Sequence, residues 1–99
     1  MKVRYRARAL EDVDGIYQWL AHHSTNVAEK VEAALMTAAE WLGQHPELGT
    51  MTDTANVRRW PMPDFRYTIF YLIDRDDEKV DVLRVMDGRR VRNLKRLPN

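Results

Sequence analysis

The chain has 99 residues, of which 44% are hydrophobic and 31% charged, so we expect one domain over residues 1–99 with a single packed core. It has no cysteine, which excludes a disulfide framework and any thiolate metal site. No apolar run approaches the roughly 20 residues of a membrane helix, so we expect a cytoplasmic protein without a membrane partner.

The net charge of +1 hides an asymmetry along the chain. Residues 11–47 hold seven acids and one base, a net of −6, so the rest of the chain carries +7. Five bases without an acid follow the last predicted strand: Arg89, Arg90, Arg92, Lys95 and Arg96. This cluster is either a contact surface for phosphate or an acidic protein, or a solvated tail.

Residues 2–8 alternate apolar and basic side chains, which predicts a half-exposed strand at a sheet edge. We interpret Arg4 and Arg6 as edge charges that block unwanted pairing, not as ligand-binding groups. Apolar residues then recur three and four apart, which predicts a helix over residues 9–22: Leu10, Val13, Ile16, Tyr17 and Leu20. Acids are expected in the first turns of this helix, where the helix dipole favours them.

Residues 26–44 are predicted to form a second, longer helix. Asn26 and Glu29 have the spacing of a capping box, and Pro46 ends the pattern. The short connection predicts a helical hairpin, with Trp19 and Trp41 in the core or between the helices. We interpret His22 and His23 as a helix end, and we expect no metal site and no cofactor.

The second half of the chain is predicted to be a loop at 47–55 followed by strands. The first strand covers residues 56–60, before two prolines, and the second covers 65–73. A charged turn at 74–78 leads into the last strand at 79–86. The order β-α-α-β-β-β predicts an α+β fold in which an antiparallel sheet packs on an N-terminal helical hairpin.

Arginine on or near strands is the main chemical signal of the sequence, because arginine recognises phosphate and carboxylate groups. If Ile73 pairs with Val80, then Arg66 lies opposite Asp87 as an ion pair, and Arg84 faces the other side of the sheet. A shift of one residue places Arg66 and Arg84 on the same face. The sequence leaves both registers open.

The chain resembles the RelE/ParE superfamily of bacterial type II toxins over nearly its whole length. The resemblance rests on residues 8–12 leading into the first helix, on His45-Pro46-Glu47-Leu48-Gly49 after the second, and on Phe65-Arg66-Tyr67-Thr68-Ile69-Phe70-Tyr71. The stretch Val82-Leu83-Arg84-Val85-Met86 with Gly88-Arg89-Arg90 completes it. The resemblance implies a toxin that is neutralised in a hetero-oligomer with a cognate antitoxin.

Two activities divide this superfamily. RelE-like members cut mRNA on the ribosome, and the resemblance to them implies Arg59, Arg66 and Arg89 as nuclease residues. This chain departs from that group because Val57 replaces a lysine and the last tyrosine is Tyr71, far from the C-terminus. The helical hairpin and the residues 46–49 are instead ParE-like, although Asp87 stands where a histidine is common.

The ParE-like interpretation implies a growth-arresting, plasmid-stabilising toxin that binds and inhibits DNA gyrase without chemistry of its own. The alternatives are a ribosome-dependent mRNA endonuclease and a non-toxic binding module on the same fold. The expected target-binding residues are Arg59, Trp60, Arg66, Arg84, Arg89 and Arg90, and Trp60 is alternatively a residue that closes the sheet edge. The expected antitoxin-binding residues are Leu10, Val13, Tyr17, Trp19 and Trp41.

Overall fold

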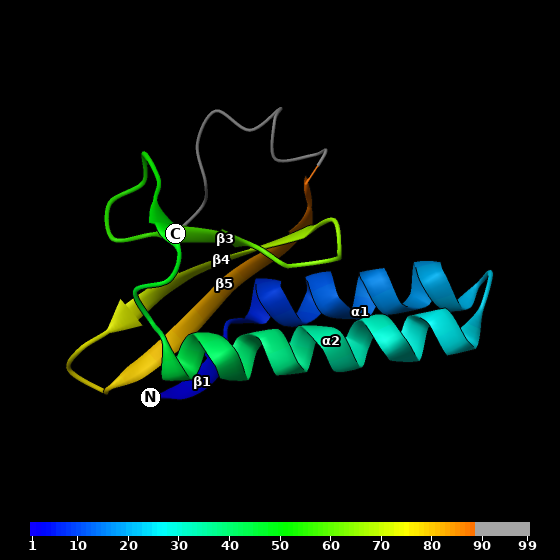
Figure 1. Ribbon diagram of the computed structural model, residues 1–99, viewed down its shortest axis with the longest axis horizontal. Helices are drawn as coiled ribbons and strands as arrows, with labels where there is room; N and C mark the ends of the chain where they lie inside the picture. The colour runs from blue at the N-terminus through cyan, green and yellow to red at the C-terminus, as the bar shows by residue number, and fades with distance from the viewer. Residues whose placement is uncertain (89–99) are drawn as a thin grey trace.

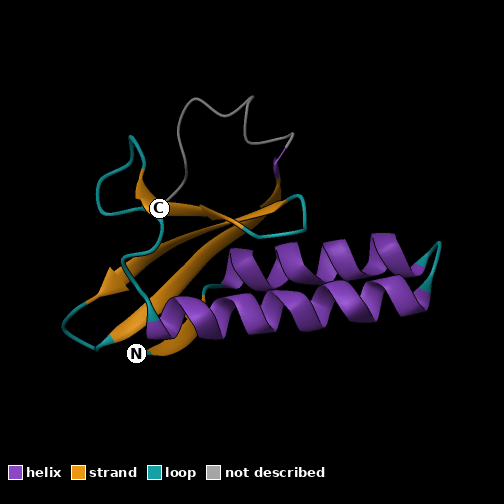
Figure 2. Ribbon diagram, in the orientation of Figure 1, coloured by secondary structure: helices purple, strands orange, loops and turns teal. Residues whose placement is uncertain are grey.

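The computed structural model describes residues 1–88, which form two layers, with a pair of helices packed on one face of a sheet (Figures 1 and 2). The elements in chain order are β1 (Lys2–Tyr5), α1 (Ala7–Ala21), α2 (Thr25–Gln44), β2 (Thr50–Met51), β3 (Arg58–Pro61), β4 (Tyr67–Asp74) and β5 (Lys79–Asp87). The predicted α+β fold with an N-terminal helical hairpin is confirmed. The basic cluster that begins at Arg89 and Arg90 lies outside the described residues.

The sheet is mixed, where the sequence predicted an antiparallel one. Its order is β1-β5-β4-β3-β2, with β1 parallel to β5 and the other pairs antiparallel. The parallel pair arises because the helical hairpin, a long crossover, separates β1 from the other strands. The predicted edge position of β1 is confirmed, and the two-residue strand β2 lies in the predicted loop 47–55.

Arg4 on β1 and Arg6, which follows β1 as the N-cap of α1, have a role that the sequence did not indicate. Nε of Arg4 lies 2.6 Å from Oδ1 of Asp81, and Nη2 of Arg6 lies 2.7 Å from Oδ2 of the same carboxylate. The Asp81 side chain is fully buried, and the hydrogen bond from Arg4 lowers its pKa although burial opposes this. The two arginines therefore serve as partners of a buried acid on β5.

The N-cap of the second helix lies two residues before the predicted one. Ser24 is the N-cap, and its Oγ accepts a hydrogen bond from the backbone N–H of Val27 at 3.3 Å. The capping box predicted at Asn26 is wrong, because Asn26 already lies inside α2. Serine and asparagine are both strong N-caps, so residue type alone does not determine which of the two caps the helix.

The core lies between the helices and the sheet, and Tyr71 anchors it to the turn after α2. Its fully buried hydroxyl donates to the carbonyl of Pro46 and accepts from the N–H of Gly49, both at 2.8 Å. A Cβ on Gly49 would lie 2.8 Å from that hydroxyl, so the turn requires glycine. Residues 45–49 and the aromatic strand, which the sequence linked only by resemblance, therefore form one structural unit.

A β-bulge decides the register that the sequence left open. Ile73 pairs with Val80, but the pairing shifts by one residue between Phe70 and Tyr71. Tyr67, not Arg66, therefore pairs with Asp87, but Nε of Arg66 still lies 3.2 Å from Oδ2 of Asp87 as an ion pair, and Arg66 lines the same pocket as Arg84. The prediction that Arg66 lies opposite Asp87 is wrong, because the bulge inserts one extra residue into β5. The ion pair forms all the same, and Arg66 shares a pocket with Arg84, as expected of the shifted register.

Candidate functional site

The short edge strands leave the sheet open at one end. β1 pairs only with residues 79–82 of β5, and β2 pairs only with residues 58–59 of β3. Both uncovered stretches lie at the end where β4 begins, above the helical hairpin in the view of Figure 1. A groove lies beside each of them, and the two grooves differ in chemistry.

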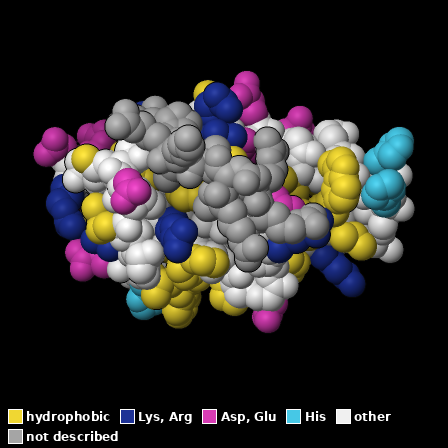
Figure 3. All heavy atoms as spheres, turned by 90° about the horizontal axis from the view of Figure 1, so that it is seen from above, with side chains coloured by type: hydrophobic (Ala, Val, Ile, Leu, Met, Phe, Trp, Pro, Cys, Tyr) yellow, Lys and Arg dark blue, Asp and Glu magenta, His cyan; other side chains and the backbone are white. Residues whose placement is uncertain are grey.

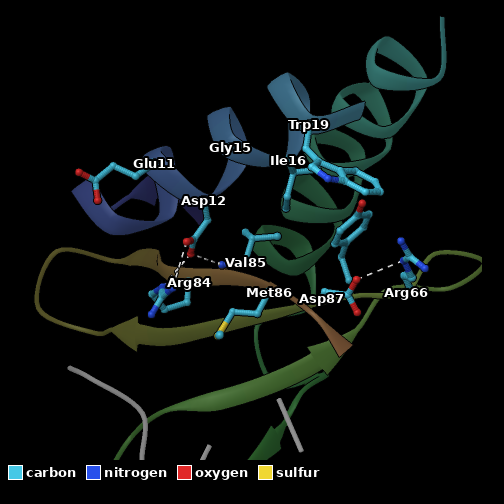
Figure 4. Close-up of a pocket in the computed structure, with 11 residues that line it drawn as sticks. Glu11, Asp12, Gly15, Ile16, Trp19, Arg66, Arg84, Val85, Met86 and Asp87 are labelled. Carbon is cyan, nitrogen blue, oxygen red and sulfur yellow. Dashed lines mark hydrogen bonds and ion pairs between the residues drawn. The ribbon is translucent and has the colours of Figure 1, made fainter. Parts of the chain in front are cut away.

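The first groove, here called the polar groove, lies between α1 and the uncovered edge of β5 and has a volume of about 460 Å³. Figure 4 shows its walls, with α1 above and the end of β5 below. It is lined by Glu11, Asp12, Gly15, Ile16, Trp19, Arg66, Tyr67, Arg84, Val85, Met86 and Asp87. The lining combines three carboxylates, two guanidinium groups and an exposed indole.

Asp12 holds one end of the polar groove together. Its carboxylate accepts from Nε of Arg84 at 2.7 Å and from Nη2 at 3.1 Å, and it also accepts from the backbone N–H of Val85 at 2.9 Å (Figure 4). Both side chains are mostly buried, and the pair raises the pKa of Arg84 above its ordinary value. Asp12 therefore fixes α1 to β5 and blocks the open backbone edge at this point.

Arg66 and Asp87 form the other end of the polar groove. Arg66 lies just before β4, not inside it as predicted, and its carbonyl accepts from the N–H of Gly88 at 2.6 Å. Its side chain remains half exposed, whereas that of Asp87 is 20% exposed. The carboxylate therefore orients Arg66 at the rim while leaving much of the guanidinium open to a partner.

Trp19 covers the polar groove from α1 without entering the core. It is 57% exposed and meets the ring of His23 edge-on, with centroids 5.4 Å apart. Trp41 is also exposed, and its ring lies 4.2 Å from that of His45. The prediction that both tryptophans lie in the core or between the helices is wrong, because each is exposed and packs on a histidine four residues later in the chain, at or beyond the end of its helix.

The second groove, here called the apolar groove, lies between α2 and the uncovered part of β3 and has a volume of about 440 Å³. It is lined by Ala33, Ala34, Thr37, Ala38, Trp41, Trp60, Met62 and Pro63, none of which is charged. Hydrophobic side chains reach the surface along one long side of the molecule (Figure 3). Trp60 is half-buried against the core, as expected of a residue that closes the sheet edge.

The remaining predicted residues lie apart from these grooves. Leu10 is exposed on α1, while Val13 and Tyr17 are partly buried on it. Arg59 is exposed on β3 opposite Phe70, and Arg66 precedes Phe70 by four residues, about 13 Å along an extended strand. The two described members of the predicted nuclease set are therefore not brought together, and Arg89 lies outside the described residues.

Sequence reasoning missed two residues that organise the polar groove. The acids near the start of α1, Asp12 among them, were predicted to lie in its first turns, whereas α1 begins at Ala7 and has no acid in its first turn. Asp87 was considered as a partner in one possible register and as a departure from the ParE-like pattern. No sequence signal connects Asp12 with Arg84, because they are 72 residues apart and meet only when α1 lies along β5. Among residues 1–88 no cluster of potential metal ligands is found, and no helix is long and apolar enough to cross a membrane.

The fold and the family of the chain are defined by comparison with known proteins. Its structure is similar to that of a chain from the chromosomal ParDE toxin-antitoxin system of P. aeruginosa, with a TM-score of 0.76 over 88% of this chain and 95% of that one. The sequence identity of 17% supports a common fold alone.

Sequence comparison carries the assignment further. Residues 3–92 match the family of ParE toxins of the type II toxin-antitoxin system parDE. A protein of Sinorhizobium fredii (strain NBRC 101917 / NGR234) named "Putative toxin Y4kP" is 31% identical over 85 residues, which cover 86% of this chain and 85% of that protein. The chain therefore belongs to the ParE toxin family, and the predicted ParE-like resemblance is confirmed.

Proposed function

We propose that this ParE-family toxin arrests growth by binding DNA gyrase at the polar groove, and that a cognate antitoxin neutralises it in a hetero-oligomer. The observation that carries the proposal is the rim of that groove, where Arg66 and Trp19 are both half or more exposed. Arginine and tryptophan dominate the energetics of protein–protein interfaces. A groove of this composition suits a protein surface with acidic and apolar groups.

The charges of the polar groove favour a protein target over a nucleic-acid phosphate. Arg84 is engaged by Asp12, and Arg66 is oriented by Asp87. Glu11 adds a third carboxylate, so an entering phosphate would meet three acids against two bases. Protein surfaces tolerate such mixed charge well, because their own bases and acids can be placed to match it.

The same groove suggests how an antitoxin prevents target binding. Trp19 was expected to contact the antitoxin and Arg66 the target, and both line the polar groove. An antitoxin that lies along α1 would cover Trp19 and close access to Arg66. Neutralisation then follows from competition for one surface and requires no change in the fold of the toxin.

The test combines a purified and a cellular measurement. Arg66→Ala is compared with Arg75→Ala, which removes a more exposed arginine (66% against 50%) from a surface ion pair with Glu47. We expect the unaltered toxin and Arg75→Ala to inhibit gyrase supercoiling, and Arg66→Ala to need at least about tenfold more protein, as for a hot-spot residue. Induced cells should switch on a DNA-damage reporter and keep intact mRNA.

Two results would contradict the proposal in different ways. Growth arrest with cleaved mRNA and a silent reporter would assign a ribosome-dependent endonuclease. No arrest, with supercoiling unaffected at saturating protein, would assign a non-toxic binding module. Equal losses of gyrase inhibition and antitoxin affinity in Arg66→Ala would indicate a folding defect, which a thermal melt of the same variant detects.

A further inference from the structure

Among residues 1–88, Gly15 is the one glycine that the fold does not require. The chain has four glycines, and a Cβ on any of the other three would lie 3.1 Å or less from another atom of the protein: Gly43, Gly49 and Gly88. A Cβ on Gly15 would meet nothing within 4 Å, and the φ angle of Gly15 is not positive. Neither packing nor backbone conformation within the described residues therefore explains a glycine here.

A glycine at this position also weakens the helix that contains it. Gly15 lies in the middle of α1 and is exposed. Glycine is less favourable than alanine in a helix interior, because it loses more conformational freedom on folding. Glycine is the residue that allows another molecule to approach the backbone closely. The position is therefore a candidate for contact with a partner.

The missing side chain leaves a gap in the wall of the polar groove. Gly15 lines that groove on α1 between Glu11 and Trp19, which lie about one helical turn before and after it (Figure 4). Both neighbours have long side chains that are well exposed to solvent. The gap between them, here called the Gly15 notch, is one residue wide and open to the groove.

The floor of the groove beside the notch is apolar, and a cation lies at its rim. Ile16 is partly buried against the core, and Val85 and Met86 on β5 are buried. All three line the groove, together with the half-exposed guanidinium of Arg66. A side chain that enters the notch therefore finds apolar contacts below it and a positive charge nearby. Residues that dominate a protein–protein interface are typically buried in pockets of this kind.

From this geometry we propose that the target inserts a bulky apolar side chain into the Gly15 notch, next to an acidic residue that faces Arg66. Trp19 forms one wall of the notch, so an aromatic ring or a methionine of the target would also contact the indole. The inference rests on the proposed binding of gyrase at the polar groove. It makes Gly15 a residue that determines which protein segment fits there.

The charge of the hairpin argues against a second copy of the chain as the occupant. Residues 11–47 hold seven acids and one base. Two copies that faced each other through α1 would bring Glu11, Asp12 and Asp14 of both chains together. Like charges placed against one another disfavour an interface. A segment whose acid lies beside Arg66 avoids this repulsion and gains an ion pair.

The first experiment adds volume to the notch. Gly15→Ala and Gly15→Leu are compared with Gln18→Leu, which places a leucine at an exposed position of α1 that does not line the groove. Gly15→Ala should raise the melting temperature by about 5 °C, because alanine favours the helix. The same variant should need about threefold more protein to inhibit gyrase supercoiling, and Gly15→Leu about tenfold more, because each overfills the notch. Gln18→Leu should inhibit like the unaltered toxin.

The second experiment uses the absence of cysteine from the chain. Gly15→Cys introduces a single thiol in the notch, and Gln18→Cys introduces one outside it. Each variant is alkylated with iodoacetamide, free and in complex with gyrase, and the extent of alkylation is read from the mass of the toxin. With gyrase at about ten times the Kd of the variant, alkylation of Gly15→Cys should slow about tenfold, because only the free toxin reacts. Alkylation of Gln18→Cys should continue in the complex.

Each further outcome has a distinct meaning. A variant that melts higher but inhibits more weakly has lost a contact and not its fold, which supports the notch. If both Gly15 variants inhibit gyrase fully while Arg66→Ala does not, the notch is overturned and the proposed function stands. If they instead lose affinity only for the protein encoded beside the toxin gene, the target is overturned as the occupant. A lower melting temperature of Gly15→Ala would overturn the open notch itself. If the unaltered toxin leaves supercoiling unaffected, the proposed function fails and the inference fails with it.

Discussion

The two grooves of this toxin lie at the same end of one sheet, yet they are built from different chemistry. The polar groove is bounded by ion pairs between α1 and the end of β5, namely Asp12 with Arg84 and Arg66 with Asp87. The apolar groove has no charged residue in its lining and is bounded by the small residues of α2, with Trp41 and Trp60. One helical hairpin therefore forms a wall of two grooves with different linings, one charged and one apolar.

The residues that were predicted to bind the target and those predicted to bind the antitoxin do not form separate groups in the structure. Trp19 lies with Arg66 and Arg84 in the polar groove, while Trp41 lies with Trp60 in the apolar groove. A partner that needs only one groove can therefore be separated from a partner that needs both. This makes the comparison testable with single substitutions on each side.

The largest expected effect comes from removing the carboxylate that fixes the polar groove. Asp12→Ala leaves the mostly buried Arg84 without its partner and the N–H of Val85 without an acceptor. Breaking such a buried pair from one side typically costs about 3 kcal/mol of unfolding free energy. Urea denaturation of Asp12→Ala and of Asp14→Ala, an exposed acid on the same helix, measures the difference.

Asp14→Ala should stay within about 0.5 kcal/mol of the unaltered protein, as surface substitutions usually do. If Asp12→Ala were equally mild, the ion pair would not hold α1 to β5, and the polar groove would lose its structural basis. Asp12→Asn adds resolution, since it keeps an acceptor for Val85 but loses the charge.

A smaller effect on stability is expected at Asp81, the buried acid of β5, and this effect depends on pH. The pKa of Asp81 is lowered by Arg4, so its contribution to stability is fully present above its unfolded pKa of about 4. This contribution is lost as the pH falls through the folded pKa. Asp81→Asn should cost about 2 kcal/mol near neutral pH, and its stability should change less than that of the unaltered protein below pH 4.

Thermal melts between pH 7 and pH 2 measure this dependence for both proteins. The apolar groove offers a matched control, because Trp60→Phe changes no titratable group and should leave the pH dependence parallel to that of the unaltered protein. A parallel curve for Asp81→Asn would instead assign the acid sensitivity to other carboxylates.

The sequence predicted the elements of the fold because each carries its own local signal. The spacing of Leu10, Val13 and Ile16 identifies α1, and the alternation of residues 2–8 identifies an edge strand. The contacts that build the polar groove have no such signal. The pair Asp12–Arg84 depends on how α1 crosses β5, and the common pocket of Arg66 and Arg84 depends on one β-bulge. The spacing alone predicted the two tryptophans in the core or between the helices, because helical spacing does not distinguish a core stripe from a binding stripe.

Substitution of the two exposed tryptophans should change stability least, yet it tests most directly whether the two grooves act separately. Trp19 and Trp41 are 57% and 48% exposed, so replacing either with alanine should change the unfolding free energy by less than about 1 kcal/mol. Binding should respond differently, because Trp19 borders Arg66 and Trp41 does not. We expect Trp19→Ala to weaken both gyrase inhibition and antitoxin affinity, and Trp41→Ala to weaken antitoxin affinity alone. Supercoiling assays and calorimetric titration of the same two variants measure both quantities. If Trp41→Ala also reduced gyrase inhibition at unchanged stability, the target would extend across the hairpin into the apolar groove, and the two surfaces would act as one.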